Sequence, residues 1–284
     1  MLHKSTIQLL RFQFSYFLMP LYWFSLSFID HINLTNAIVI FIILHLLVYP
    51  SSNGYNSYMD KDEEPIGGVE NPLQPTRQLF LVTIILDLLA IASAFFISTW
   101  FALSIIVYII CSRLYSYRGV RLKQYPILGY VVVILNQGAL TFYMIYHGIT
   151  HDAATVFPLH GLLAATFLIG GFYPITQIYQ HASDAKDGVQ TISMMLGKKG
   201  TMVFCGIMYL IAFSILGHYY MIQDHVRSFI ILQIFFIPVL VFFIRWAARI
   251  WKEEGAADFK NTMQMNWLAS TCTSLAFITL ILLQ

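Results

Sequence analysis

Long apolar runs separated by short polar segments extend along the whole chain. A helix needs about 20 apolar residues to cross a hydrocarbon core of roughly 30 Å, and the chain contains nine such windows. We therefore predict an all-α integral membrane protein with nine transmembrane helices, and the lack of internal repeats predicts a single domain over residues 1–284. The windows cover residues 12–29, 35–55, 79–97, 99–115, 126–147, 157–179, 201–221, 228–244 and 263–283, with the third and fourth dividing near Ser98.

Composition and charge agree with this prediction. Of the 284 residues, 58% are hydrophobic and 11% are charged, and the mean hydropathy is +0.69. Positive charges test the helix count, because cytoplasmic loops of membrane proteins are enriched in Lys and Arg. With nine helices, every one of the 16 Lys and Arg residues except Arg227 falls on the same side. We therefore expect a cytoplasmic N-terminus, cytoplasmic loops after the even-numbered helices and an external C-terminus.

Several other function classes are not indicated by the sequence. The net charge is +2, and no polar segment carries a basic stripe with interleaved aromatic residues, so we expect no nucleic-acid partner. Cys111, Cys205 and Cys272 lie inside apolar runs without CxxC spacing, which favours buried thiols over a disulfide or a zinc site. The first apolar run follows a short basic start and is long enough to span, so it is expected to be a retained helix.

Two acidic clusters lie where an apolar run meets a polar loop. In the first, Asn56, Asp60 and Glu64 are four residues apart, a spacing that places side chains on one helix face. In the second, Gln180 and Asp184 have the same spacing. Oxygen ligands from two helices, with positions left open for water or phosphate, suit Mg²⁺. Polar helix ends are also common at membrane interfaces, so an ordinary interfacial role for either cluster stays open.

A basic loop lies between the two clusters in sequence. It contains Arg118, Arg121 and Lys123, and Tyr115 precedes them. Three cations facing two acidic clusters can hold a diphosphate whose charge a metal does not fully cover. Ordinary enrichment of positive charge in cytoplasmic loops is the alternative explanation.

These motifs together resemble the UbiA superfamily of intramembrane prenyltransferases. The resemblance covers nearly the whole chain, and its specificity comes from three motifs in the right order on the same predicted side. The family's NDxxDxxxD motif is similar to the segment with Asn56, Asp60 and Glu64. Its second acidic motif, with the Gly and Thr that follow, is similar to Gln180, Asp184, Gly188 and Thr191. Its YS...LKR loop is similar to Tyr115, Ser116, Arg121, Leu122 and Lys123.

The resemblance implies a helical bundle around a central cavity. Mg²⁺ would bridge both acidic motifs, held by Asn56, Asp60, Glu64, Gln180 and Asp184, to the diphosphate of an isoprenoid donor. Asp60 and Asp184 would be the catalytic carboxylates, and a hydrophobic acceptor would capture the allylic carbocation in a dry, aromatic-lined cavity. The acceptor pocket would draw on Asn53, Gln137 and Tyr179, although the same residues can serve as helix-to-helix hydrogen bonds.

The chain departs from the family pattern at three positions. Glu64 replaces Asp, Gln180 replaces the first Asp of the second motif, and Asn71 stands where many members have Arg. The loss of a carboxylate at Gln180 is expected to weaken or rearrange metal binding. Two alternatives to a prenyltransferase therefore stay open: a terpene cyclase of the same superfamily that needs no acceptor, and a non-catalytic isoprenoid or quinone binder.

Two polar residues fall near the middle of predicted helices. His45 and Asp87 each lie roughly ten residues from the predicted cytoplasmic end. A bare charge at that depth costs about 2.5–3.5 kcal/mol on insertion scales, so each residue needs a partner inside the bundle. We predict a hydrogen bond between His45 and Asp87, with a catalytic base as the alternative role.

Overall fold

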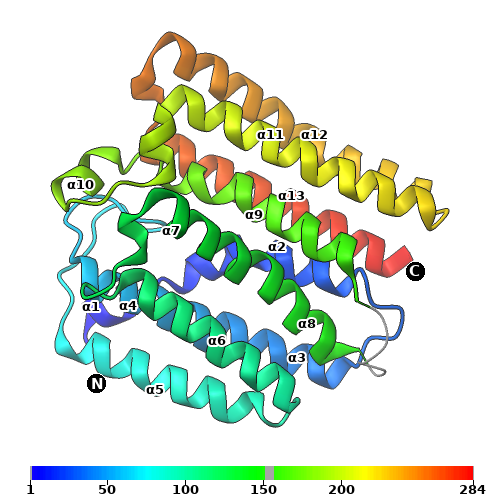
Figure 1. Ribbon diagram of the computed structural model, residues 1–284, viewed down its shortest axis with the longest axis horizontal. Helices are drawn as coiled ribbons and strands as arrows, with labels where there is room; N and C mark the ends of the chain where they lie inside the picture. Colours follow the sequence, from blue (N-terminus) through cyan, green and yellow to red (C-terminus); the bar gives the residue numbers. More distant parts are fainter. Residues whose placement is uncertain (1, 151–156, 284) are drawn as a thin grey trace.

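The structure, a computed structural model, describes residues 2–150 and 157–283 and is a bundle of helices (Figure 1). Within these residues it has no β-strand, and eight helical runs are long and apolar enough to cross a membrane. They are α3 (Leu34–Ile42) continued by η2 (Ile43–Val48) and α4 (Tyr49–Asp60), α5 (Arg77–Ala94), α6 (Thr99–Ser116), α7 (Pro126–Val133) continued by η4 (Ile134–Leu140) and α8 (Thr141–Ile149), α9 (Leu159–Gln177), α11 (Ile192–Ile222), α12 (Val226–Lys252) and α13 (Phe259–Leu283).

The count of nine spans is not confirmed, and the difference lies at the N-terminus. Here the chain forms α1 (Lys4–Leu9), η1 (Phe12–Phe14) and α2 (Ser15–Leu26). With 12 residues and a rise of 1.5 Å per residue, α2 is only about 18 Å long, which is too short to cross the hydrocarbon core alone. It packs inside the bundle against α8 and α13 instead (Figure 1).

An aromatic core holds α2 in this central position. Phe24 of α2 has ring centroids 5.1 Å from Phe142 of α8 and 4.8 Å from Phe277 of α13. All three rings are fully buried. Aromatic pairs at such separations add to the gain from burial, so α2 joins the two halves of the bundle.

The predicted division of the third and fourth apolar runs is confirmed. α5 ends at Ala94 and α6 begins at Thr99. Ser98 is the N-cap of α6, since its hydroxyl oxygen accepts a hydrogen bond from the Phe101 N–H at 3.0 Å. A capping serine satisfies one of the backbone donors that a helix start leaves unpaired.

The segments predicted to be cytoplasmic lie at one end of the bundle. This end contains α1, the α6–α7 loop with η3 (Leu122–Gln124), and α10 (His181–Lys186), while the C-terminus lies at the other end (Figure 1). The 3-10 turn η5 (Glu254–Ala256) joins α12 to α13. Which end faces the cytoplasm stays a prediction from the Lys and Arg distribution.

The predicted pair of His45 and Asp87 is wrong. Asp87 forms an ion pair with Arg113 and accepts a hydrogen bond from the Ser51 hydroxyl at 2.6 Å. Arg113 lies in the last turn of α6 and reaches Asp87 of α5 from there. His45 is buried in η2, with its ring stacked on Phe41 at a centroid distance of 4.4 Å.

Close helix packing at Gly138 leads to a first prediction. A Cβ at this position of η4 would lie 2.9 Å from the Cα of Thr166 in α9. Because the obstacle is backbone, Gly138→Ala is expected to lower the melting temperature in detergent, with a cost of about 1–3 kcal/mol for overpacking. Gly206→Ala is the matched control, since its new Cβ would have its nearest neighbour at 3.7 Å. Equal melting temperatures for the two variants would contradict the predicted clash.

Candidate active site

A polar cavity of about 170 Å³ brings together residues from the three predicted motifs. It lies among α4, α6, η4, α9 and the loops that follow α4 and α9. Of the predicted site residues, its described lining includes Asn53, Asn56, Asp60, Tyr115, Lys123, Gln137, Gln180 and Asp184. The same lining does not include Glu64, Arg118, Arg121 or Tyr179.

The last turn of α4 places Asn56 and Asp60 on one face, as the four-residue spacing predicts. The Asn56 amide donates to Asp60 Oδ2 at 2.7 Å and to the Ser116 hydroxyl at 3.0 Å. The Asp60 side chain is only 4% exposed. An ordered amide therefore fixes the orientation of a buried carboxylate.

The extrapolation of this face to Glu64 is wrong, because α4 ends at Asp60. Lys61 has a left-handed conformation with φ of 55°, and the chain leaves the helix there. Glu64 is 58% exposed and lies 3.4 Å from the Lys186 ammonium at the surface. Asp62 lines the cavity instead. Burial, followed by the charge of Asp60, raises the pKa of Asp62 to about 6.

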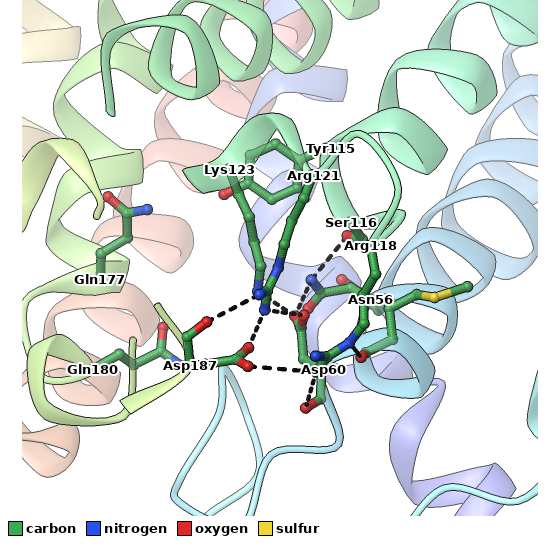
Figure 2. Close-up of polar contacts among 12 residues, drawn as sticks. Asn56, Asp60, Tyr115, Ser116, Arg118, Arg121, Lys123, Gln177, Gln180 and Asp187 are labelled. Atoms are coloured by element: carbon green, nitrogen blue, oxygen red, sulfur yellow. Dashed lines mark hydrogen bonds and ion pairs between the residues drawn. The ribbon is translucent and has the colours of Figure 1, made fainter. Parts of the chain in front are cut away.

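The basic loop lies against the acidic clusters (Figure 2). The Lys123 ammonium is 2.6 Å from Asp60 Oδ2. The Arg121 guanidinium forms an ion pair with Asp187 and lies 3.6 Å from Asp60 Oδ1. Arg118 is half exposed and lies 3.5 Å from Asp187. Two of the three predicted cations are thus buried against carboxylates, and the third lies at the rim.

The second cluster begins where α9 ends. Gln180 precedes α10 and donates from its amide to the Pro65 carbonyl at 3.4 Å. Asp184 lies one turn further, with its N–H bonded to the Gln180 carbonyl at 2.9 Å. Burial raises the pKa of Asp184 to about 7, and the charge of Lys123 opposes this shift.

Gln177 lines the polar cavity, and the sequence interpretation does not identify it as a candidate. Its amide donates to the Tyr173 hydroxyl at 2.8 Å, and the Tyr173 hydroxyl is also hydrogen bonded to that of Tyr115. Gln177 lines the cavity and is 6% exposed, and its Oε1 has no hydrogen-bond partner among the described residues. It was overlooked because it lies inside the apolar run, three residues before the cluster.

Arg11 is a second site residue that was missed. The sequence analysis uses Arg11 only as one of the positive charges that indicate the cytoplasmic side. In the structure it is 7% exposed and lines the cavity. Its guanidinium donates to the Asn53 carbonyl and to Asn56 Oδ1, both at 3.2 Å. The backbone of Arg11 has φ of 48°, a left-handed conformation that is uncommon for residues other than glycine. Nothing in the sequence marked this turn.

The three residues predicted for an acceptor pocket have different surroundings. Asn53 lies on α4 and Gln137 on η4, and both line the cavity. The π-helical turn of η4 also brings Asn136 to the lining, in keeping with the frequent location of such turns at functional sites. Tyr179 lies outside the lining, with its ring packed against Phe259.

An apolar cavity of about 570 Å³ lies next to the polar one. It is lined by residues of α2, α9, α11, α12 and α13, and Phe and Leu side chains make up much of its lining. Leu18 and Phe172 line both cavities. The two cavities are therefore neighbours, one charged and one apolar.

Comparison with protein families decides the classification. The model of the UbiA prenyltransferase family matches residues 17–269. The chain belongs to this family. Among curated proteins, no sequence matches it. The UbiA match covers both acidic clusters and the basic loop, and it agrees with the resemblance seen in the sequence.

Solved structures confirm the UbiA fold. A UbiA homolog from Archaeoglobus fulgidus bound to DMAPP and Mg²⁺ is 17% identical with a TM-score of 0.73, covering 99% of this chain and 100% of that one. A digeranylgeranylglyceryl phosphate synthase is 18% identical with a TM-score of 0.64, covering 99% of each chain. A UbiA homolog from Aeropyrum pernix K1 is 17% identical with a TM-score of 0.69, covering 95% and 98%. At these identities the similarity is one of fold.

Proposed function

We propose that this UbiA family protein is a Mg²⁺-dependent intramembrane prenyltransferase. It would move an isoprenoid chain from a prenyl diphosphate to an aromatic, quinone-precursor or other lipophilic acceptor. The observation that carries the proposal is a charged cavity beside an apolar one, with Leu18 and Phe172 in the lining of both. Homologues bound to DMAPP and Mg²⁺ and to GPP and Mg²⁺ support the same ligand class.

The polar cavity is lined by the oxygen donors that Mg²⁺ prefers, although no three His, Cys, Asp or Glu side chains among the described residues are already arranged to hold a metal ion. Asp60 Oδ1 is buried and has no hydrogen-bond partner among the described residues, although Arg121 is within ion-pair distance. Asp62 and Asp184 supply further carboxylate oxygens, and amide oxygens complete a hard-oxygen set of the kind that Mg²⁺ prefers. We propose that these three carboxylates hold the ion, with Asn56 and Gln180 beside them. When bound, Mg²⁺ would neutralise charge on the diphosphate.

The chain's own cations would stabilise the leaving diphosphate, and its aromatic residues would shield the allylic cation. Lys123 and Arg121, with Arg118 at the rim, would offset the charge of a departing diphosphate, and their ion pairs with the acidic clusters support this role. Phe172 and the buried Tyr108 would keep water away from the allylic cation and present ring faces to it. Asn53 and Gln137 stay candidates for holding the acceptor.

Diphosphate release is the direct test. Purified protein with Mg²⁺ and prenyl diphosphates of several lengths is expected to release inorganic diphosphate only when a suitable acceptor is added. Chelation with EDTA should abolish release, and added Mg²⁺ should restore it, because the donor set is oxygen only. A cyclic hydrocarbon formed from the donor alone would indicate a cyclase. No release with any donor and acceptor would indicate a non-catalytic binder.

A further inference from the structure

The ammonium of Lys123 lies among the carboxylates that we assign to the metal. Its Nζ is 2.6 Å from Asp60 Oδ2, and the side chain is 10% exposed. Its positive charge also acts on Asp62 and on Asp184, one from each acidic segment. Figure 2 shows its side chain extending from the loop toward Asp60. The Lys123 ammonium is thus ion-paired with Asp60 of the first cluster and acts electrostatically on Asp184 of the second.

The backbone fixes Lys123 in this position. Arg121, two residues earlier, has a left-handed backbone conformation with φ of 47°, so the chain turns sharply there. Gly129 of α7 packs directly on the loop, since a Cβ there would lie 3.2 Å from the Cα of Lys123. The side chain above this rigid base is long and unbranched, so its ammonium can move while the backbone stays in place.

The charges around the cavity indicate that the Lys123 ammonium and a divalent metal ion would compete for the same carboxylates. Within the described lining, the carboxylates are Asp60, Asp62 and Asp184 and the cations are Arg11 and Lys123. The same part of the chain contains no group of three or more His, Cys, Asp or Glu side chains arranged to hold a metal ion. A divalent ion and an ammonium repel each other and compete for the same oxygens. Gln177 and Gln180 also line the cavity, but their amides are neutral and add no negative charge that could bind a second cation.

We propose that Lys123 is a built-in counter-ion that takes the place of the metal in the ligand-free protein. When a diphosphate arrives, the ammonium transfers from Asp60 to phosphate oxygens, and the released carboxylates bind the divalent ion. Metal and diphosphate therefore bind strongly only together. The inference rests on the proposed function, because it assigns the metal to these carboxylates.

Binding of Mn²⁺, followed by electron paramagnetic resonance, tests the proposal without turnover. Wild-type protein is expected to bind Mn²⁺ weakly alone and about tenfold or more tightly when inorganic diphosphate is present. Lys123→Met removes the charge and keeps a long, unbranched side chain. It is expected to bind Mn²⁺ alone about tenfold or more tightly than wild type and to lose most of the gain from diphosphate. Lys186→Met, at a surface lysine that is 73% exposed, should behave as wild type.

A second measurement uses the unaltered protein, in case Lys123→Met does not fold. Saturating Mn²⁺ alone is expected to increase amine-reactive labelling of Lys123, read by mass spectrometry, and to leave Lys186 unchanged. Unchanged or weaker Mn²⁺ affinity in folded Lys123→Met, or constant Lys123 labelling, would overturn the counter-ion role while the metal site stands. Wild-type protein that binds no Mn²⁺ even with diphosphate would overturn both proposals.

Discussion

Asp60→Asn is expected to lower the rate of diphosphate release by about 100- to 1,000-fold, the range seen when one charge-stabilising group is removed from an active site. The substitution keeps the shape of the side chain and removes a buried negative charge. It also leaves the Lys123 ammonium, 2.6 Å away, without its carboxylate partner. Both effects weaken the coupling of metal and diphosphate. Steady-state release of diphosphate from a prenyl donor, with Mg²⁺ and acceptor, measures the loss.

Glu64→Gln is the matched control for this prediction. It makes the same change of charge four residues further along, at a side chain that is 58% exposed and paired with Lys186 at the surface. Exposed ion pairs contribute only about 0–1 kcal/mol, so activity should stay within about fivefold of wild type. A similar loss in Glu64→Gln, with Asp60→Asn near wild type, would restore the helical extrapolation and remove Asp62 from the site. Melting temperatures of both variants check that folding is intact.

The bundle could be predicted because a membrane helix is specified by length and apolarity alone. The runs around α5 and α6 show this, since even their division at Ser98 agrees with the sequence. The first run is not confirmed as a span, because the helix that it forms, α2, has only 12 residues. Hydropathy alone does not give the length of the helix that an apolar run will form.

The candidate site was predictable only where regular geometry continues. Asn56 and Asp60 share a helix turn, so their spacing located them correctly. One residue later, at Lys61, the chain leaves the helix in a left-handed turn. As a result Asp62 lines the cavity, and Glu64 does not. The buried side chain of Arg11 likewise follows from a turn, since its own φ is 48°. Such turns depend on tertiary packing, which a single sequence does not display.

Asp87→Leu is expected to destabilise the protein by about 3–5 kcal/mol, because it leaves Arg113 as an unpaired charge inside the bundle. The two side chains are only 13% and 20% exposed. Arg113 also donates to Ser51 of α4 and Thr83 of α5, both at 3.2 Å, so the pair joins three helices. The free energy of unfolding in mixed micelles measures the loss. Leu88→Ala is the control, because Leu88 is next to Asp87 in the sequence and its side chain is 62% exposed on the surface of the bundle.

The double variant Asp87→Leu with Arg113→Met should recover most of the stability that either single change loses. It removes both charges, and an apolar replacement of a buried ion pair is often neutral. The remaining hydroxyls keep acceptors, since Ser51 donates to the Thr83 carbonyl and Thr83 to the Phe80 carbonyl, each at 2.8 Å. Additive losses in the double variant would mean that the two residues act independently. In that case the cost of each substitution would come from lost packing, and the ion pair would not be what joins α5 to α6.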